Sequence, residues 1–124
     1  MELSLHLKQS DDTPEVFYDQ QNYCLKITGR SMPENAAKFC EPIFNWITQY
    51  MLNPQQRLDI VFDLEYFNSA SARKIIEMLI AFENIADKVK VVWLHKENDD
   101  LIRERGEELQ AIIHLPFEIQ ATNN

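Results

Sequence analysis

Glycine is scarce in this chain of 124 residues, which contains only Gly29 and Gly106. A phosphate-binding P-loop or a dinucleotide-binding fingerprint needs several glycines at fixed spacing, because the backbone has to close on the phosphate. The sequence therefore excludes both kinds of nucleotide site. Long apolar runs are missing as well, since none approaches the ~18 residues needed to cross a bilayer. We expect no membrane insertion.

Cysteine and histidine are few and lack the spacing of metal ligands. Cys24 and Cys40 do not form a Cys-x-x-Cys pair, and His6, His95 and His114 lie far apart in the sequence. The amino-terminal stretch MELSLHLK alternates polar and apolar residues like a strand and does not resemble a signal peptide. We therefore expect reduced thiols in a cytoplasmic protein without metal or cofactor.

Positive charge is also limited, and the formal net charge is −8. Such a chain repels nucleic acid unless its basic residues are gathered into a patch. The largest basic clusters are Arg73-Lys74 and the pair Lys88 and Lys90, which are too small for that role. We expect no nucleic-acid partner.

What the sequence does contain is a regular alternation of strand and helix patterns within one domain, residues 1–124. Apolar residues make up 45% of the chain, an ordinary share for a globular protein. The patterns predict strands near 3–7, 15–19, 23–28, 57–67, 88–95 and 117–121, and helices over about 32–52, 68–86 and 98–114. Strands that alternate with helices in the second half indicate parallel pairing. The predicted fold class is α/β, with a mixed sheet and three main helices.

The strand at 57–67 has two unlike faces. Its first face is apolar and is formed by Leu58, Ile60, Phe62, Leu64 and Tyr66. Its second face carries Asp59, Asp63 and Glu65, together with Val61 and Phe67. This predicts a sheet whose helices cover one side and leave the other to solvent or a partner. The three carboxylates also allow an alternative function, a small enzyme that uses them for acid–base chemistry.

Helix boundaries are indicated by capping residues. Ser31 and Glu34 have the spacing of a capping box, with Pro33 in the first turn of the helix that follows. Pro42 lies inside that helix and is expected to kink or split it. Asn98 or Asp99 is expected to cap the last helix.

The stretch Asn68-Ser69-Ala70-Ser71 joins the strand at 57–67 to the next helix. Asn and Ser are common helix caps, which is sufficient reason for their presence. The same residues also lie where open α/β sheets place their sites, beyond the carboxyl end of a strand and in a first helical turn that favours anions. A phosphoryl group would be tolerated there.

The stretch EYFNSASARK resembles the Y-x-N-[ST]-S-S-x-K motif of the SiaC-type regulatory phosphoproteins, a bacterial family related in fold to the STAS domains of anti-sigma-factor antagonists. The stretch GRSMPENAAKFCEPIFNWITQYM is similar to the family's G-x-S-x-P-E-N turn and the helix that it enters, and PFEIQ is similar too. Together the resemblance extends from about residue 12 to 121. It implies a STAS-like sheet with three helices on one face.

The resemblance also implies a function, which is not enzymatic. A dedicated kinase would phosphorylate a hydroxyl at the start of the second helix, and a PP2C-type phosphatase would remove the phosphate. The unmodified protein would bind and activate a target, which in characterised systems is a diguanylate cyclase. Phosphorylation would release this target.

The family motif falls on this sequence with one departure. Its first hydroxyl, after the Asn, falls on Ser69, its second on Ala70 and its third on Ser71, while its Lys falls on Arg73 or Lys74. Because Ala70 has no hydroxyl to modify, the resemblance implies phosphorylation at Ser69, with Ser71 as the reserve. The implied partner interface consists of Tyr66, Asn68, Ser69, Ala70, Ser71, Arg73 and Lys74.

Overall fold

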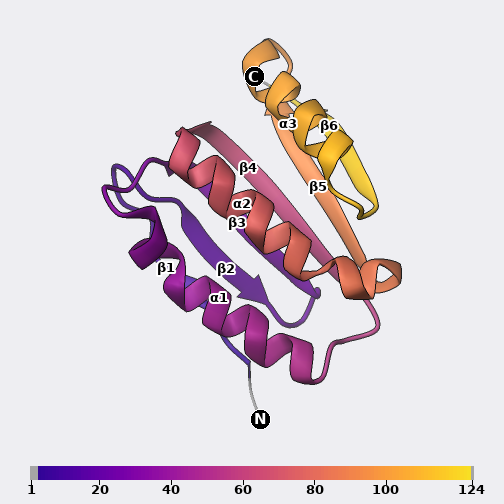
Figure 1. Cartoon of the computed structure of the whole chain (residues 1–124). Helices are drawn as coiled ribbons and strands as arrows, with labels where there is room; N and C mark the ends of the chain where they lie inside the picture. The colour runs from indigo at the N-terminus through magenta and orange to yellow at the C-terminus, as the bar shows by residue number, and fades with distance from the viewer. Residues whose placement is uncertain (1–2, 124) are drawn as a thin grey trace.

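A computed structural model describes residues 3–123 as one six-stranded mixed sheet with helices on one face (Figure 1). The strands are β1 (His6–Leu7), β2 (Glu15–Asp19), β3 (Cys24–Ser31), β4 (Leu58–Phe67), β5 (Val89–Lys96) and β6 (Phe117–Thr122). The helices are α1 (Ala36–Leu52), α2 (Ser69–Ala81) and α3 (Asp100–Ile112), with a short 3₁₀ segment, η1 (Glu83–Lys88), before β5. The predicted element order and fold class are confirmed.

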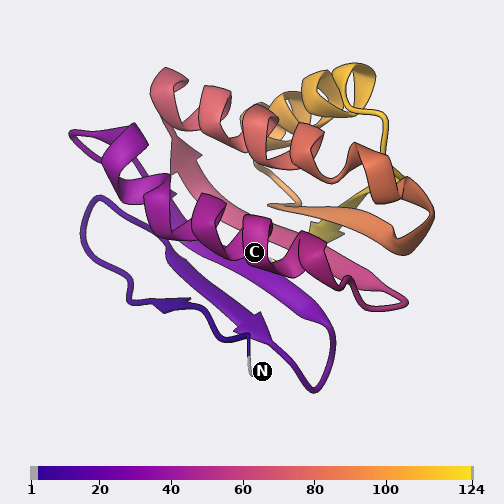
Figure 2. The ribbon, with the colours of Figure 1, turned by 60° about the horizontal axis from the view of Figure 1, so that its bottom comes forward.

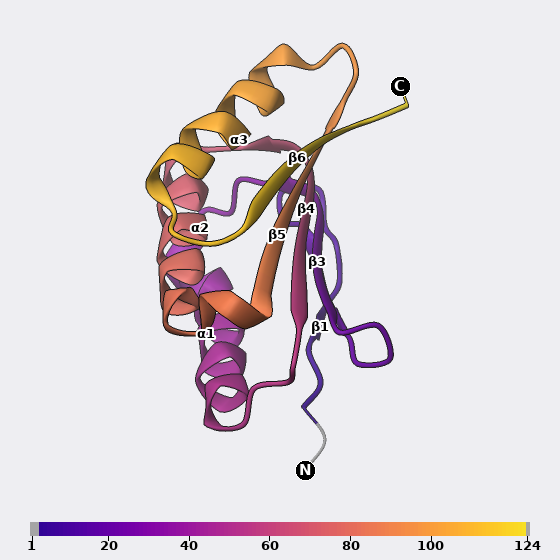
Figure 3. The same cartoon turned by 90° about the vertical axis from the view of Figure 1, so that its right-hand side faces the viewer.

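The strands lie in the sheet in the order in which they occur in the chain. β1, β2 and β3 are antiparallel neighbours, and the pairs β3–β4, β4–β5 and β5–β6 are parallel, as the alternation with helices predicts. Seen from the side in Figure 3, all three helices lie on one face of the sheet and the other face is uncovered. The parallel pairing brings the carboxyl ends of β3, β4 and β5 to one edge.

The core lies between the sheet and the helices. Its largest fully buried side chains include Trp93, Tyr50, Phe62 and Phe82. α1 and α2 lie side by side on the sheet (Figure 2), while α3 covers β5 and β6. Gly106 allows α3 to approach the sheet closely, because a Cβ at this position would lie 2.4 Å from Cδ1 of Trp93.

Two predictions about the strand at 57–67 need correction. Tyr66 is 42% exposed, and Phe67 instead packs on the core, with its ring centroid 5.7 Å from that of Trp93. The cause is a register shift in the β3–β4 pairing after Gly29, whose φ of 118° lies in the region that favours glycine. The shift exchanges the two faces at the end of β4.

The predicted start of the first helix was also wrong. Ser31 is the last residue of β3, and α1 begins at Ala36 after Asn35, whose side chain accepts a hydrogen bond from the Lys38 N–H. α1 runs through Pro42 as one helix and is not split. In the last helix, helical spacing predicts that Leu101, Ile102, Leu109, Ile112 and Ile113 face the core; this is wrong for Leu101 and Ile112, which are more than half exposed.

Candidate functional site

The carboxyl edge of the sheet carries the starts of all three helices, each capped in the same way. Asn35 caps α1, and Asn68 Oδ1 accepts from the Ser71 N–H at 2.9 Å at the start of α2. Asp99 Oδ1 accepts from the Ile102 N–H at 3.1 Å at the start of α3. A side chain at each cap thus satisfies one of the N–H groups that an α-helix leaves without a partner.

The two candidate hydroxyls at the start of α2 lie in opposite environments. Ser71 is 3% exposed, and its hydroxyl donates to the carbonyl oxygen of Ser31 and accepts from the Ser31 hydroxyl, both at 2.9 Å. Ser69 is exposed, and its hydroxyl has no hydrogen-bond partner within residues 3–123. Ser71 therefore fixes α2 to the end of β3, while Ser69 is open to solvent.

The structure leaves most of the predicted interface residues accessible at the carboxyl edge of the sheet, with Tyr66 on the uncovered face and the others on α2. Ala70 and Arg73 are exposed, and the exposed ring of Tyr66 lies under the Arg30 guanidinium, 5.9 Å away. Lys74 is partly covered and forms an ion pair with Glu77 at 3.1 Å. The two exceptions are Asn68, half-buried as the cap, and the buried Ser71.

A shallow groove of about 410 Å³ lies between the starts of α1 and α2. α1 and the turn before it supply Glu34, Asn35 and Ala37, while α2 supplies Ala70, Arg73 and Lys74. Ala70 and Arg73 therefore belong both to the predicted interface and to the groove. Sequence reasoning missed the α1 side, because the pairing of the two helices is not local.

Sequence reasoning also missed the role of Ser31, which it assigned to a cap. The signal for the Ser31–Ser71 contact was weak, since the two residues are 40 positions apart and meet only through the β3–β4 pairing. Arg30 was missed for the same reason.

The acidic side chains of β4 do not form a catalytic pair. Asp59 and Asp63 are both on the uncovered face, four residues apart, which in a strand corresponds to roughly 13 Å. Carboxyl groups that share a glycosidic bond lie about 5–9.5 Å apart. Glu65 is exposed at the register shift, and none of the three lines the groove.

The cysteines are poorly suited to nucleophilic chemistry. Burial raises the pKa of the Cys40 thiol to about 11, and burial also raises the pKa of Cys24. A thiolate is the reactive form of cysteine, so the raised pKa values make both side chains less reactive near neutral pH. Within residues 3–123, no group of three or more His, Cys, Asp or Glu side chains could hold a metal ion, and no helix is long and apolar enough to cross a membrane.

A family model of regulatory phosphoproteins, the SiaC family, matches residues 7–122 of this sequence. The chain belongs to this family. The resemblance carried by the motifs around Ser31 and Ser69 is thereby confirmed. Membership also decides against the enzyme alternative, because SiaC proteins are regulators, and the protein is not itself an enzyme.

Solved SiaC structures have the same fold. A chain in the crystal structure of the diguanylate cyclase SiaD with its activator SiaC, from Pseudomonas aeruginosa, matches with a TM-score of 0.87 and 26% identity, over 95% of this chain and 99% of that one. Apo-SiaC from P. aeruginosa matches with a TM-score of 0.83 and 26% identity, over 95% and 98% of the two chains.

A relative found by sequence is an uncharacterised protein of P. aeruginosa strain UCBPP-PA14. It is 26% identical over 120 residues, which cover 94% of this chain and 95% of the relative. The likeness therefore extends over the whole domain. It includes the edge that carries Ser69.

Proposed function

We propose that this SiaC-family protein is a partner-switching regulator controlled by phosphorylation of Ser69. The unmodified protein binds and activates a target, by likeness to SiaC a diguanylate cyclase. A dedicated kinase phosphorylates Ser69 and releases the target, and a PP2C-type phosphatase restores binding. The exposed residues Tyr66, Ser69, Ala70 and Arg73 form the contact surface, with Lys74 at its border.

The observation that carries this proposal is the contrast between the two hydroxyls of α2. A kinase needs a hydroxyl that it can reach, and Ser69 is exposed without a hydrogen-bond partner in the described chain. Phosphorylation of Ser71 would break two buried hydrogen bonds to Ser31 and place a dianion beside Ile75, Met78 and other core side chains. Burying a charge costs several kcal/mol, so Ser71 is the worse substrate.

The free protein should accommodate a phosphate at Ser69. α2 has no acidic residue in its first turn, and the helix macrodipole favours an anion there by about 0.3–1 kcal/mol. The complex with the target should not accommodate this phosphate, because a new dianion of charge about −1.5 to −2 at the contact surface has to be desolvated. Shifting a partner from about 99:1 bound to about 1:99 requires ~5.5 kcal/mol, which one uncompensated buried dianion can supply.

The first test uses protein purified from its native host. Intact mass should fall by about 80 Da on treatment with a PP2C-type phosphatase, as loss of one phosphoryl group requires. A pull-down with the dephosphorylated protein as bait should then capture a diguanylate cyclase. A constant mass together with no captured target would contradict the proposal.

A further inference from the structure

Arg73 is the cation best placed to meet a charge at position 69. It is four residues after Ser69 on α2, and side chains at this spacing are neighbours on the helix surface, with Cβ atoms ≈ 5–6 Å apart. Arg73 is exposed, and within residues 3–123 it forms no ion pair or hydrogen bond. The acid one turn further on, Glu77, pairs with Lys74 instead.

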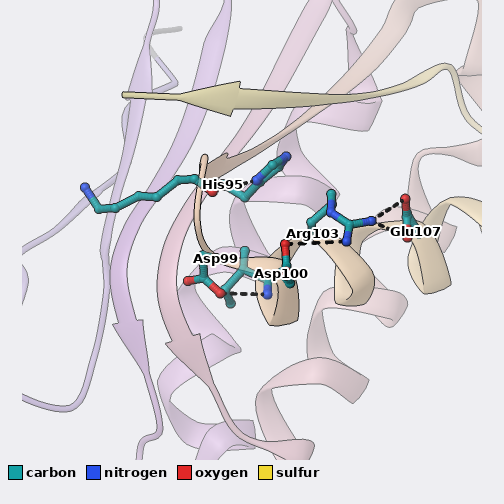
Figure 4. Close-up of polar contacts among 7 residues, drawn as sticks. His95, Asp99, Asp100, Arg103 and Glu107 are labelled. Atoms are coloured by element: carbon teal, nitrogen blue, oxygen red, sulfur yellow. Dashed lines mark hydrogen bonds and ion pairs between the residues drawn. The ribbon is translucent and has the colours of Figure 1, made fainter. Parts of the chain in front are cut away.

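α3 shows in the same molecule what an anion at this helix position does. Asp100 is the first residue of α3, as Ser69 is of α2. Its carboxylate lies 3.6 Å from the guanidinium of Arg103, three residues on, and Arg103 also reaches Glu107 at 3.2 Å (Figure 4). On α2 the first residue is an uncharged serine, the position three residues on is Ala72, and the arginine, Arg73, follows at four residues, a spacing that also makes two side chains neighbours on a helix.

We propose that Arg73 is the receptor for the phosphate on Ser69, holding it as an intramolecular ion pair across one turn of α2. This inference rests on the proposed function, since it presupposes phosphorylation at Ser69. A phosphate and a guanidinium match in geometry, because the planar fork donates two parallel hydrogen bonds to two oxygens. The phosphate would therefore give α2 an ion pair within its first turns, as Asp100 and Arg103 give α3, with a spacing of four residues in place of three.

The pair has a consequence for the groove between α1 and α2. Arg73 lines this groove, as does Lys74, which is committed to Glu77. Within the described chain, Arg73 is the one of these two cations without an ion-pair partner. When Arg73 turns to the phosphate, the groove loses this unpaired positive charge. Phosphorylation thus changes the groove as well as the charge at position 69.

Other charged groups at this edge compete less well. Arg30, at the end of β3, lies over the ring of Tyr66, and Lys74 lies 5.9 Å from the ring centroid of Phe44 in addition to its pairing with Glu77. The acids Glu34 before α1, Glu65 on β4 and Glu77 on α2 disfavour a dianion, which makes a nearby cation more important. The second pKa of the phosphate should therefore be lower when Arg73 is paired with it than when Arg73 is absent.

The test is a ³¹P NMR titration of the full-length protein with phosphoserine incorporated at position 69 during translation, so that no kinase is needed. Arg73→Gln should raise the second pKa of the phosphate by about half a unit, because an exposed opposite charge favours the dianion modestly. Arg73→Lys should raise it by less. Lys74→Gln and the α3 control Arg105→Gln should change it by less than about 0.1 unit.

Two results would overturn the inference: a phosphate pKa in Arg73→Gln within 0.1 unit of the parent, or a larger shift in Lys74→Gln than in Arg73→Gln. Circular dichroism of each variant confirms that the fold is kept. Failure of the proposed function is distinguishable, because it appears as equal target binding with serine and phosphoserine at position 69. That result does not depend on the phosphate pKa.

Discussion

The starts of α2 and α3 are built alike and charged differently. Each follows a parallel strand, each has an Asx cap that accepts from an N–H three residues on, and each has an arginine near its start, five residues after the cap in α2 and four in α3. α3 carries its own anions there, Asp99 and Asp100, whereas the first turn of α2 is Ser-Ala-Ser with no acid. Under the proposed function, a phosphate on Ser69 would supply at the start of α2 the negative charge that Asp100 supplies at the start of α3.

The two helices are also fixed to the sheet by different means. α3 is held by close packing of Gly106 on Trp93, whose indole N–H donates to the Ile102 carbonyl at 2.8 Å. α2 is held at its start by the paired hydroxyls of Ser31 and Ser71. An added Cβ at position 106 would therefore clash with Trp93, whereas loss of the Ser71 hydroxyl would leave the Ser31 hydroxyl and carbonyl without their partner.

The largest expected effect is on binding, and it comes from charging the start of α2. Phosphoserine at position 69 should weaken binding of the cognate target by up to about 10⁴-fold, measured by isothermal titration calorimetry. Ser69→Glu should weaken it less, because a carboxylate carries about half the charge. Ser69→Ala should bind as the unmodified protein does, with or without kinase. Equal affinity of all forms would contradict the switch.

Adding one methyl group to α3 should give the next largest effect. Gly106→Ala should lower the free energy of unfolding by about 1–3 kcal/mol, since the new Cβ forces Trp93 or the helix to move. An exposed glycine in a helix interior would show the reverse, a gain of about 0.5–1 kcal/mol. Urea denaturation measures whether the free energy of unfolding falls or rises in Gly106→Ala. A rise would show that the contact with Trp93 is not close.

Removing the buried hydroxyl of Ser71 tests the contact that holds the start of α2 to Ser31 at the end of β3. Ser71→Ala should cost about 1–3 kcal/mol, because it leaves the Ser31 hydroxyl and carbonyl without their partner. Ser69→Ala is the matched control two residues away, and its effect should stay within about 0.5 kcal/mol. Thermal or urea unfolding of both variants measures the contrast. Equal losses would mean that the two hydroxyls do not differ in environment as described.

Exchanging the charges of the two caps should have the smallest effect. Asn68→Asp should stabilise the protein by about 0.3–1 kcal/mol at low ionic strength, and Asp99→Asn should destabilise it by a similar amount, because an anion at a helix start interacts favourably with the macrodipole. Both changes should shrink in high salt, which denaturation at two ionic strengths can measure. Effects of the same sign in the two variants would refute the charge explanation.

The sequence predicted those features of the fold that depend on neighbouring residues. The strand and helix order and the parallel second half follow from local periodicity, and capping chemistry placed the last two helix starts at Asn68–Ser71 and at Asn98 or Asp99, where Asn68 and Asp99 are the caps. The placement of Tyr66 could not be predicted, because it depends on a register shift between two strands. Leu101 and Ile112 were misplaced because helical spacing does not say where the apolar face ends.

The candidate site was predictable in the same limited sense. The motif around Ser69 indicated the correct helix start, but nothing local predicts that Ser69 is exposed and Ser71 buried. Their difference in burial depends on Ser31, which meets α2 only in the folded protein. The groove beside them likewise requires α1.

The central claim, that Ser69 is the regulatory phosphosite, is tested most directly by mapping the phosphate. Wild type, Ser69→Ala and Ser71→Ala are treated with the cognate kinase, and the modified residue is located by mass spectrometry. We predict modification at Ser69 in wild type and in Ser71→Ala, and none in Ser69→Ala. Modification of Ser71 in Ser69→Ala, accompanied by release of the target, would contradict the account and make Ser71 the switch.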